Sequence, residues 1–181
     1  TPLYSSAASD VYKRQLQVLA DKTGSLIAAA TQGGVIFSNA PSEYEEPLRV
    51  YGEKIGVAFQ LLDDVIDLSA KPEDTGKVPG TDLRAGVPTM PYLLLKAETD
   101  DASIDLAARI DDGVTRIAEG EDPGILDGPL TELRDHVGTQ KTLALAHSWT
   151  RDAIDALTAL PRGTVRDALT RFAETLVERS S

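Results

Sequence analysis

Three aspartates lie close together in a segment that is otherwise strongly apolar. Asp63, Asp64 and Asp67 follow Gln60 in the run FQLLDDVID, which begins at Phe59. A helix places Gln60 and these aspartates on one face about 100° wide. Carboxylates packed this closely repel one another unless a cation lies between them, and carboxylate oxygens suit Mg²⁺, which keeps waters and bridges to substrate phosphates. The alternative is a solvated acidic stripe, which is common in a chain this acidic.

Two further segments carry residues that fit such a site. Lys22-Thr23 stands among small and apolar residues, and a lysine that faces the interior of a helix bundle needs an anion. The glycine-rich stretch 76–89 follows the aspartates and carries Lys77 and Asp82. We expect Lys77 to meet a diphosphate held by the metal and Asp82 to accept hydrogen bonds from metal-bound water. The alternatives are a snorkelling lysine and a glycine-proline surface loop.

Composition excludes several other classes of site. The chain has 181 residues and a formal net charge of -11, which argues against nucleic-acid binding because phosphates need a basic face. Cysteine is absent and only two histidines, His136 and His147, are present, so thiolate and multi-histidine metal sites are not expected. No apolar run approaches the roughly 18 to 20 residues that a membrane span requires. The lack of a signal pattern predicts a cytoplasmic protein.

Hydrophobic periodicity predicts helices nearly throughout the chain. The helix at 42–68 is expected to bury Phe59 and Ile66 along with its other large apolar residues. A loop is expected over 71–88. The fold class is therefore all-α, an antiparallel helix bundle. The expected helices cover residues 16–33, 42–68, 89–97, 104–118, 130–146, 148–160 and 164–179.

The first fifteen residues differ from the rest. They are small and polar at first, and the run DVYKRQ over 10–15 resembles what one reading frame of a transposon sequencing adapter encodes. We therefore interpret residues 1–15 as a non-native or disordered segment and residues 16–181 as the folded part. The alternative is a natural, poorly ordered terminus.

Taken in order along the chain, the motifs resemble the C-terminal half of a trans-type polyprenyl diphosphate synthase. The resemblance covers about 16–179 and implies an all-α bundle of the isoprenoid synthase type, truncated on its N-terminal side. Each motif is weak alone, whereas the ordered set is specific. The matching pieces are Lys22-Thr23, Phe59-Gln60, Asp63-Asp64-x-x-Asp67, Gly76-Lys77-x-x-Gly80-Thr81-Asp82-Leu83, Leu157-x-x-Leu160-Pro161 and Leu169-x-x-Phe172-Ala173.

The resemblance also implies an activity, a metal and a set of roles. The reaction is the head-to-tail condensation of an allylic prenyl diphosphate with isopentenyl diphosphate, dependent on Mg²⁺, with Mn²⁺ as the alternative metal. The full-length form is expected to be a homodimer, and its lipid product suggests a location peripheral to the membrane. The implied roles are metal binding by Asp63, Asp64 and Asp67, diphosphate binding by Lys22 and Lys77, and support of metal-bound water by Asp82. Thr23 and Gln60 would line the path of the reacting cation, and Phe59 would shape the apolar wall of the pocket.

Two departures from the family pattern matter. The first aspartate-rich motif of the family is absent, together with the basic residues that bind isopentenyl diphosphate. The chain alone is therefore expected to be inactive, and it is expected to associate through apolar helix faces that a whole bundle would cover. Many members carry lysine where Val87 stands, and this makes Arg84 the candidate substitute.

Two alternative functions fit parts of the sequence. A class I terpene synthase would use a second metal motif, and the stretch from Asp111 to Glu119 fits its loose form except at Gly113. A non-catalytic helical subunit of a heteromeric prenyl synthase is the other alternative. Such subunits usually lose the aspartates, whereas this chain keeps all three.

Overall fold

The computed structural model describes residues 3–69 and 78–178, with side chains from residue 11 onward, and every regular element in these ranges is a helix. The predicted all-α fold class is thus confirmed for the described residues. The chain forms two compact units, unit 1 (Thr1–Arg14 and Asp63–Leu143) and unit 2 (Gln15–Leu62 and Ala144–Ser181). None of the described helices is long and apolar enough to cross a lipid bilayer.

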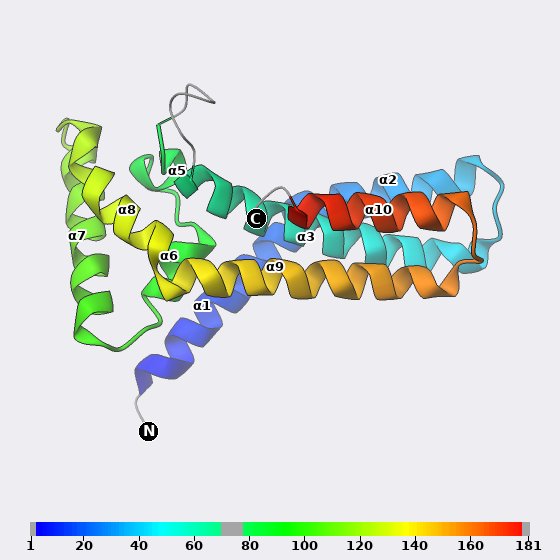
Figure 1. Cartoon of the computed structure of the whole chain (residues 1–181), viewed down its shortest axis with the longest axis horizontal. Coiled ribbons are helices and arrows are strands. Elements are labelled where there is room, and N and C mark those ends of the chain that lie inside the picture. The colour runs from blue at the N-terminus through cyan, green and yellow to red at the C-terminus, as the bar shows by residue number, and fades with distance from the viewer. Residues whose placement is uncertain (1–2, 70–77, 179–181) are drawn as a thin grey trace. The chain divides into compact units, whose positions relative to one another are not determined.

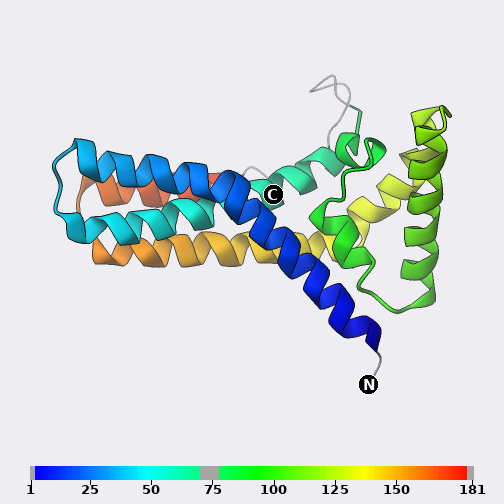
Figure 2. The same cartoon turned by 180° about the vertical axis from the view of Figure 1, so that it is seen from behind.

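Unit 2 is built from long helices that lie side by side, and both views show this packing for α2, α10 and the parts of α3 and α9 that belong to the unit (Figures 1 and 2). Its buried side chains include Tyr51, Ile55, Ala153 and Leu157. The elements that contribute to it are α1 (Leu3–Leu19), η1 (Ala20–Gly24), α2 (Ser25–Phe37), η2 (Ser42–Tyr44), α3 (Glu45–Ser69), α9 (Val137–Ala156), η4 (Leu157–Ala159) and α10 (Thr164–Glu178).

Small residues allow α3 to approach the preceding helices closely. A β-carbon on Gly56 would lie only 2.5 Å from the Cα of Gly24, so the two backbones are in direct contact at this point. Nearer the start of α3, the Thr31 hydroxyl donates to the carbonyl oxygen of Leu48 at 2.6 Å. These contacts fix η1 and α2 against α3 within unit 2.

Unit 1 consists of shorter helices around a separate core. Besides its parts of α1, α3 and α9, it contains α5 (Thr81–Arg84), α6 (Met90–Leu95), α7 (Asp101–Ala118), η3 (Pro123–Leu126) and α8 (Asp127–Asp135). Asp100 caps α7 by accepting a hydrogen bond from the amide of Ser103 at 3.0 Å. The core consists of Leu68, Leu83, Tyr92, Leu95, Leu106, Ala107, Ile110, Leu126, Leu130 and Leu133.

Several helix boundaries differ from those expected. Residues 3–15 are part of the helix α1, and neither glycine nor proline interrupts the sequence between Leu3 and Leu19. The origin of residues 1–15 stays a prediction. The break expected near residue 147 falls at His136 instead, whose ψ of 153° is extended. Directly after it, a β-carbon on Gly138 would lie 2.8 Å from the carbonyl oxygen of Pro91, so the start of α9 packs tightly on α6.

Two expected core residues are exposed. Phe59 and Ile66 each keep 42% of their surface accessible, contrary to the prediction that α3 buries them. Apolar residues occur on more than one side of this helix, whereas the described helices pack against only part of its circumference. A single periodic pattern therefore overestimates what is buried.

Candidate functional site

Two of the three aspartates at the end of α3 are held by backbone amides of the segment that follows. The Oδ2 atom of Asp64 accepts a hydrogen bond of 2.7 Å from the backbone nitrogen of Met90, at the start of α6. Asp67 accepts longer hydrogen bonds from the amides of Thr81 at 3.2 Å and Asp82 at 3.3 Å, at the start of α5. The chain therefore returns to α3 twice, and each return brings an amide to a carboxylate.

A glycine makes the first return feasible. Gly80 has a φ of 70°, in the left-handed region that favours glycine, and its amide donates to the carbonyl oxygen of Asp67 at 2.9 Å. A β-carbon at this position would lie 2.5 Å from Cδ1 of Leu130 in α8. The left-handed backbone conformation therefore favours glycine where α5 meets Asp67, and the close contact with Leu130 adds to this preference.

Burial and mutual repulsion make these carboxylates costly to ionise. Burial, aided by the nearby charges of Asp82, Asp63 and Asp67, raises the pKa of Asp64 to about 7, although the Met90 amide opposes the shift. Burial and the charge of Asp82 also raise the pKa of Asp67, against the effect of the α5 amides. Four carboxylates thus create a local excess of negative charge, which a bound cation would relieve.

The donor set fits a hard divalent cation that takes few protein ligands. Within residues 3–69 and 78–178, no three carboxylate or imidazole groups are already gathered around one point. Asp63 is exposed, whereas Asp64 and Asp67 bond to amides of different helices. Mg²⁺ commonly uses only one or two carboxylates and completes its shell with water and substrate phosphates. The chemistry of the donors therefore suits Mg²⁺ without a closed cage of protein ligands.

The predicted Lys22 and Thr23 lie in unit 2, in the π-helical turn η1. Such wide turns are frequent at functional sites. Lys22 is exposed and forms no ion pair with any side chain that the structure describes. The carbonyl carbon of Thr23 would lie 3.1 Å from a β-carbon on Gly56, one helical turn before Gln60 in α3. Unit 2 therefore brings Thr23 close to the α3 turn that leads to Gln60.

The remaining predicted residues have different outcomes. Gln60 is half-buried and Phe59 is largely exposed, both in unit 2. Asp82 lies at the start of α5, with its amide on Asp67. Lys77 falls outside the described residues. The pairing of Lys22 and Lys77 with the aspartates stays a prediction.

Arg84 does not stand in for the lysine expected at position 87. Its Nε donates to the carbonyl oxygen of Pro79 at 2.8 Å, one terminal nitrogen donates to that of Pro123, and the other pairs with Asp127 at 2.6 Å. With only 8% of its side chain exposed, Arg84 is committed to holding α5 against the start of α8. Its guanidinium group therefore has a structural role, connecting α5 to α8.

The aspartates of the second metal motif that a terpene synthase would use are also engaged by other side chains. Asp111 accepts a hydrogen bond from the Tyr92 hydroxyl and pairs with Lys96 at 2.9 Å. Asp112 lies 3.4 Å from Arg116 in an i,i+4 pair. Because cations of the protein already neutralise these carboxylates, nothing here favours that alternative.

Sequence reasoning missed the amide of Met90 as a partner of Asp64. Pro91 predicted a helix start at this place, which is confirmed, but no signal showed that the first amide faces α3. The neighbouring Thr89 is 2% exposed, and its hydroxyl has no hydrogen-bond partner. The π-helical geometry at Lys22 was likewise unsignalled, apart from the glycine at position 24.

Residues 4–118, more than half of the chain, match the family model described as Polyprenyl synthetase. The chain belongs to the polyprenyl synthetase family. This confirms the resemblance carried by the motifs. The match begins at residue 4, inside the segment interpreted as non-native.

Several characterised relatives are similar over nearly the whole chain. The nonaprenyl diphosphate synthase of Mycobacterium tuberculosis is 35% identical over 94% of this chain and 49% of its own length. The octaprenyl diphosphate synthase of Escherichia coli is 33% identical, with 91% and 49% covered. The chain thus spans about half the length of the curated relatives it matches.

Solved structures agree. The geranylgeranyl pyrophosphate synthase of Corynebacterium glutamicum, complexed with calcium and isoprenyl diphosphate, matches with a TM-score of 0.77 at 32% identity, over 92% of this chain and 50% of that one. A polyprenyl synthase of Caulobacter crescentus, in a complex with the same ligands, gives a TM-score of 0.78 at 30% identity, over 92% and 49%. The isoprenoid synthase fold expected from the motifs is therefore confirmed.

Proposed function

We propose that this chain forms the metal- and diphosphate-binding part of a trans-type polyprenyl diphosphate synthase. The observation that carries the proposal is the proximity of Asp64, Asp67 and Asp82, where burial, together with the charges of neighbouring carboxylates, raises the pKa of Asp64 and Asp67. Such an arrangement is unfavourable for the protein alone and becomes favourable when a divalent cation is bound. Family membership supports the same assignment.

The proposed reaction joins an allylic prenyl diphosphate to isopentenyl diphosphate. The allylic carbon–oxygen bond breaks and its electron pair leaves with the diphosphate. The alkene of isopentenyl diphosphate then forms the new carbon–carbon bond, and a proton is lost. A bound Mg²⁺, or Mn²⁺ in its place, would withdraw charge from the leaving diphosphate as a Lewis acid.

The residues of this chain would position that diphosphate. Asp63, Asp64 and Asp67 would supply the metal ligands, with the amides of Met90, Thr81 and Asp82 fixing the orientation of two of these carboxylates. We infer that Lys22 binds the diphosphate, since it is exposed and carries no ion pair within the described residues. A homodimer of the full-length protein, and association of this chain through exposed apolar faces, stay predictions.

Calorimetric titration of the chain with geranyl diphosphate tests this function. Mg²⁺ is expected to add a binding component that is absent in EDTA, and this metal-dependent binding should weaken at least about tenfold in the Asp64→Asn and Asp67→Asn double variant. The matched control is Asp111→Asn with Asp112→Asn, which removes carboxylates from ion pairs elsewhere in unit 1 and should leave affinity unchanged. Equal affinity in both double variants would contradict the proposal.

Product analysis separates the enzymatic alternatives. Incubation of the full-length protein with geranyl diphosphate, isopentenyl diphosphate and Mg²⁺ should give a longer prenyl diphosphate. A volatile hydrocarbon would indicate a terpene synthase. Normal prenyl transfer after replacement of Asp63 and Asp67 by alanine would instead indicate a scaffold role for this part of the protein.

A further inference from the structure

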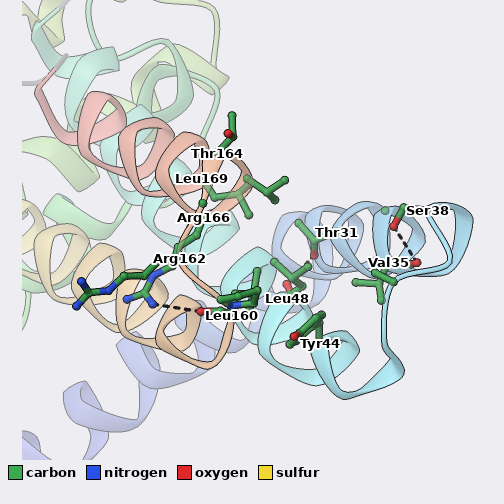
Figure 3. Close-up of a pocket in the computed structure, with 15 residues that line it drawn as sticks. Thr31, Val35, Ser38, Tyr44, Leu48, Leu160, Arg162, Thr164, Arg166 and Leu169 are labelled. Atoms are coloured by element: carbon green, nitrogen blue, oxygen red, sulfur yellow. Dashed lines mark hydrogen bonds between the residues drawn. The ribbon is translucent and has the colours of Figure 1, made fainter.

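Unit 2 contains a cavity that includes none of the residues discussed so far as metal or diphosphate ligands. It has a volume of about 680 Å³ and lies between α2, the beginning of α3 and the beginning of α10. Figure 3 shows Val35 of α2 facing Leu169 of α10 across it, with Leu48 of α3 and Tyr44 of η2 between them. We call it the α2–α10 cavity. Its size is that of a site for a small organic molecule.

The walls of the α2–α10 cavity are mostly apolar, and the hydroxyl groups of Thr31 and Ser38 are already engaged by backbone carbonyl oxygens. Val35, Leu48, Leu160 and Leu169 contribute hydrocarbon surface. The Thr31 hydroxyl donates to the carbonyl oxygen of Leu48 at 2.6 Å, so it offers little to a polar ligand. The interior therefore suits a hydrocarbon chain.

The mouth of the cavity is basic, in contrast to the acidic chain. Arg162 and Arg166 both line the cavity, and none of its lining side chains is acidic. Neither guanidinium group forms an ion pair among the described residues; Arg166 donates to the carbonyl oxygen of Leu160 at 3.2 Å (Figure 3). In Figure 3 the guanidinium groups of both arginines extend away from Val35 and Leu48, so each must rotate about its side-chain bonds to reach an anion at the mouth; Arg162 is exposed.

The start of α10 adds to this positive potential. The helix begins at Thr164, and the amide of Asp167 donates to the carbonyl oxygen of Gly163 at 3.0 Å, which makes Gly163 the capping residue. A glycine has no side chain with which to cap, so the first amides of α10 lack an acceptor from that position. These amides lie beside the cavity and, together with the arginines, favour a negatively charged group there.

We propose that the α2–α10 cavity binds an amphipathic anion, a linear hydrocarbon chain that carries a phosphate or carboxylate group. The chain lies against Val35, Leu48 and Leu169, and the anionic head is bound by Arg162 and Arg166 at the start of α10. The combination of an apolar cavity with an unpaired basic rim carries this assignment. It does not involve a metal and does not depend on the aspartates.

Calorimetric titration of the full chain in EDTA tests the proposal, because the metal-dependent site is then silent. Geranyl diphosphate and decanoate should each bind saturably at one site and compete with each other, below the concentrations at which they form micelles. Pyrophosphate, which has no chain, and geraniol, which has no charge, should bind at least about tenfold more weakly. Absence of binding by both amphiphiles would overturn the proposal.

A charge placed at the mouth identifies the cavity as the site. Val165 is 67% exposed and is the second residue of α10, where an acidic side chain is compatible with the helix dipole, so Val165→Asp should fold normally. It should weaken binding in EDTA at least about tenfold by repelling the head group, whereas the nearly isosteric Val165→Asn should change it less than twofold. Equal effects of the two variants would contradict the assignment.

Two further measurements exclude other occupants. A photoreactive geranyl diphosphate analogue should label the segment 160–169 in EDTA, and labelling elsewhere would overturn the proposal. Sedimentation should show no change in association state on Val165→Asp; a dimer that this variant dissociates would mean that a second copy of the chain occupies the cavity.

The two proposed sites can be tested separately. The Asp64→Asn and Asp67→Asn double variant should lose only the binding that needs Mg²⁺, so failure of either proposed site is distinguishable from failure of the other.

Discussion

The backbone nitrogen of Met90 lies 2.7 Å from Oδ2 of Asp64 and donates a hydrogen bond to it. This bond joins the start of α6 to the end of α3, and its two residues are 26 positions apart in the sequence. It orients one carboxylate of the aspartate cluster, while burial and the neighbouring acids keep that carboxylate hard to ionise. Stability and ligand binding are thus in conflict at Asp64, and the conflict is measurable.

The free energy of unfolding should depend on the protonation of Asp64. Its pKa is raised from 3.8 to about 7 in the folded chain, so the folded state binds this proton more tightly than the unfolded state does. The stabilising contribution is therefore complete below about pH 4 and is lost as the pH rises through 7. In EDTA, we expect the free energy of unfolding to fall by about 2 kcal/mol between pH 5 and pH 8 from this group, less than the full shift implies because Asp64 keeps some solvent contact.

Urea denaturation of Asp64→Asn at both pH values provides the check. Asparagine keeps an acceptor for the Met90 amide but does not titrate, so much of the pH dependence should disappear and the variant should be more stable than the wild type at pH 8. Asp63→Asn is the matched control, because Asp63 is exposed and lies in the same helix. A wild-type stability that rises from pH 5 to pH 8 would refute the assignment.

Replacing Gly80 by alanine should destabilise unit 1 and disturb the aspartates. Alanine at a φ of 70° is strained, and its β-carbon would lie 2.5 Å from Cδ1 of Leu130. We expect a loss of about 2–4 kcal/mol in the free energy of unfolding, together with weaker binding of geranyl diphosphate in Mg²⁺ because the α5 amides move away from Asp67. Denaturation and calorimetry measure the two effects.

Gly128→Ala in α8 is the control for that substitution. A β-carbon at Gly128 meets no atom within 4 Å, so the change should be neutral or stabilising by about 0.5–1 kcal/mol. If both alanine variants behaved alike, the requirement for a left-handed residue at position 80 would be wrong.

The cluster of aspartates and the helix starting near Pro91 could be predicted from sequence, because helical spacing and proline position are local properties. The break at His136 could not, because it accompanies the close approach of Gly138 to α6, where an added β-carbon would lie 2.8 Å from the Pro91 carbonyl oxygen, a contact between segments distant in sequence. The same holds for the Met90 amide on Asp64 and for the engagement of Arg84 by Asp127. Periodicity identifies which residues share a face, whereas tertiary contacts decide which backbone groups and charges that face meets.

Arg84→Met should cost about 2–3 kcal/mol of unfolding free energy. The substitution keeps the apolar stem but leaves the carbonyl oxygens of Pro79 and Pro123 and the carboxylate of Asp127 without their donor. Arg109→Met, which breaks exposed ion pairs in the same unit, should cost less than about 1 kcal/mol. Chemical denaturation compares the two, and a smaller loss for Arg84 than for Arg109 would argue against the structural role of Arg84.

Gly56→Ala should disrupt the contact between η1 and α3 in unit 2. Its β-carbon would lie 2.5 Å from the Cα of Gly24. The atoms nearest to it are all backbone atoms of η1, so no flexible side chain can move aside to relieve the clash. We expect a loss of about 2–4 kcal/mol in unfolding free energy. Because the displaced η1 carries Lys22 and Thr23, geranyl diphosphate should also bind more weakly in Mg²⁺.

Gly34→Ala is the control, since it lies in α2 with no atom within 4 Å of the added methyl and should be stabilising by about 0.5–1 kcal/mol. A destabilised Gly56→Ala variant with unchanged affinity would separate the fold of unit 2 from diphosphate binding, and would remove Lys22 from the proposed site.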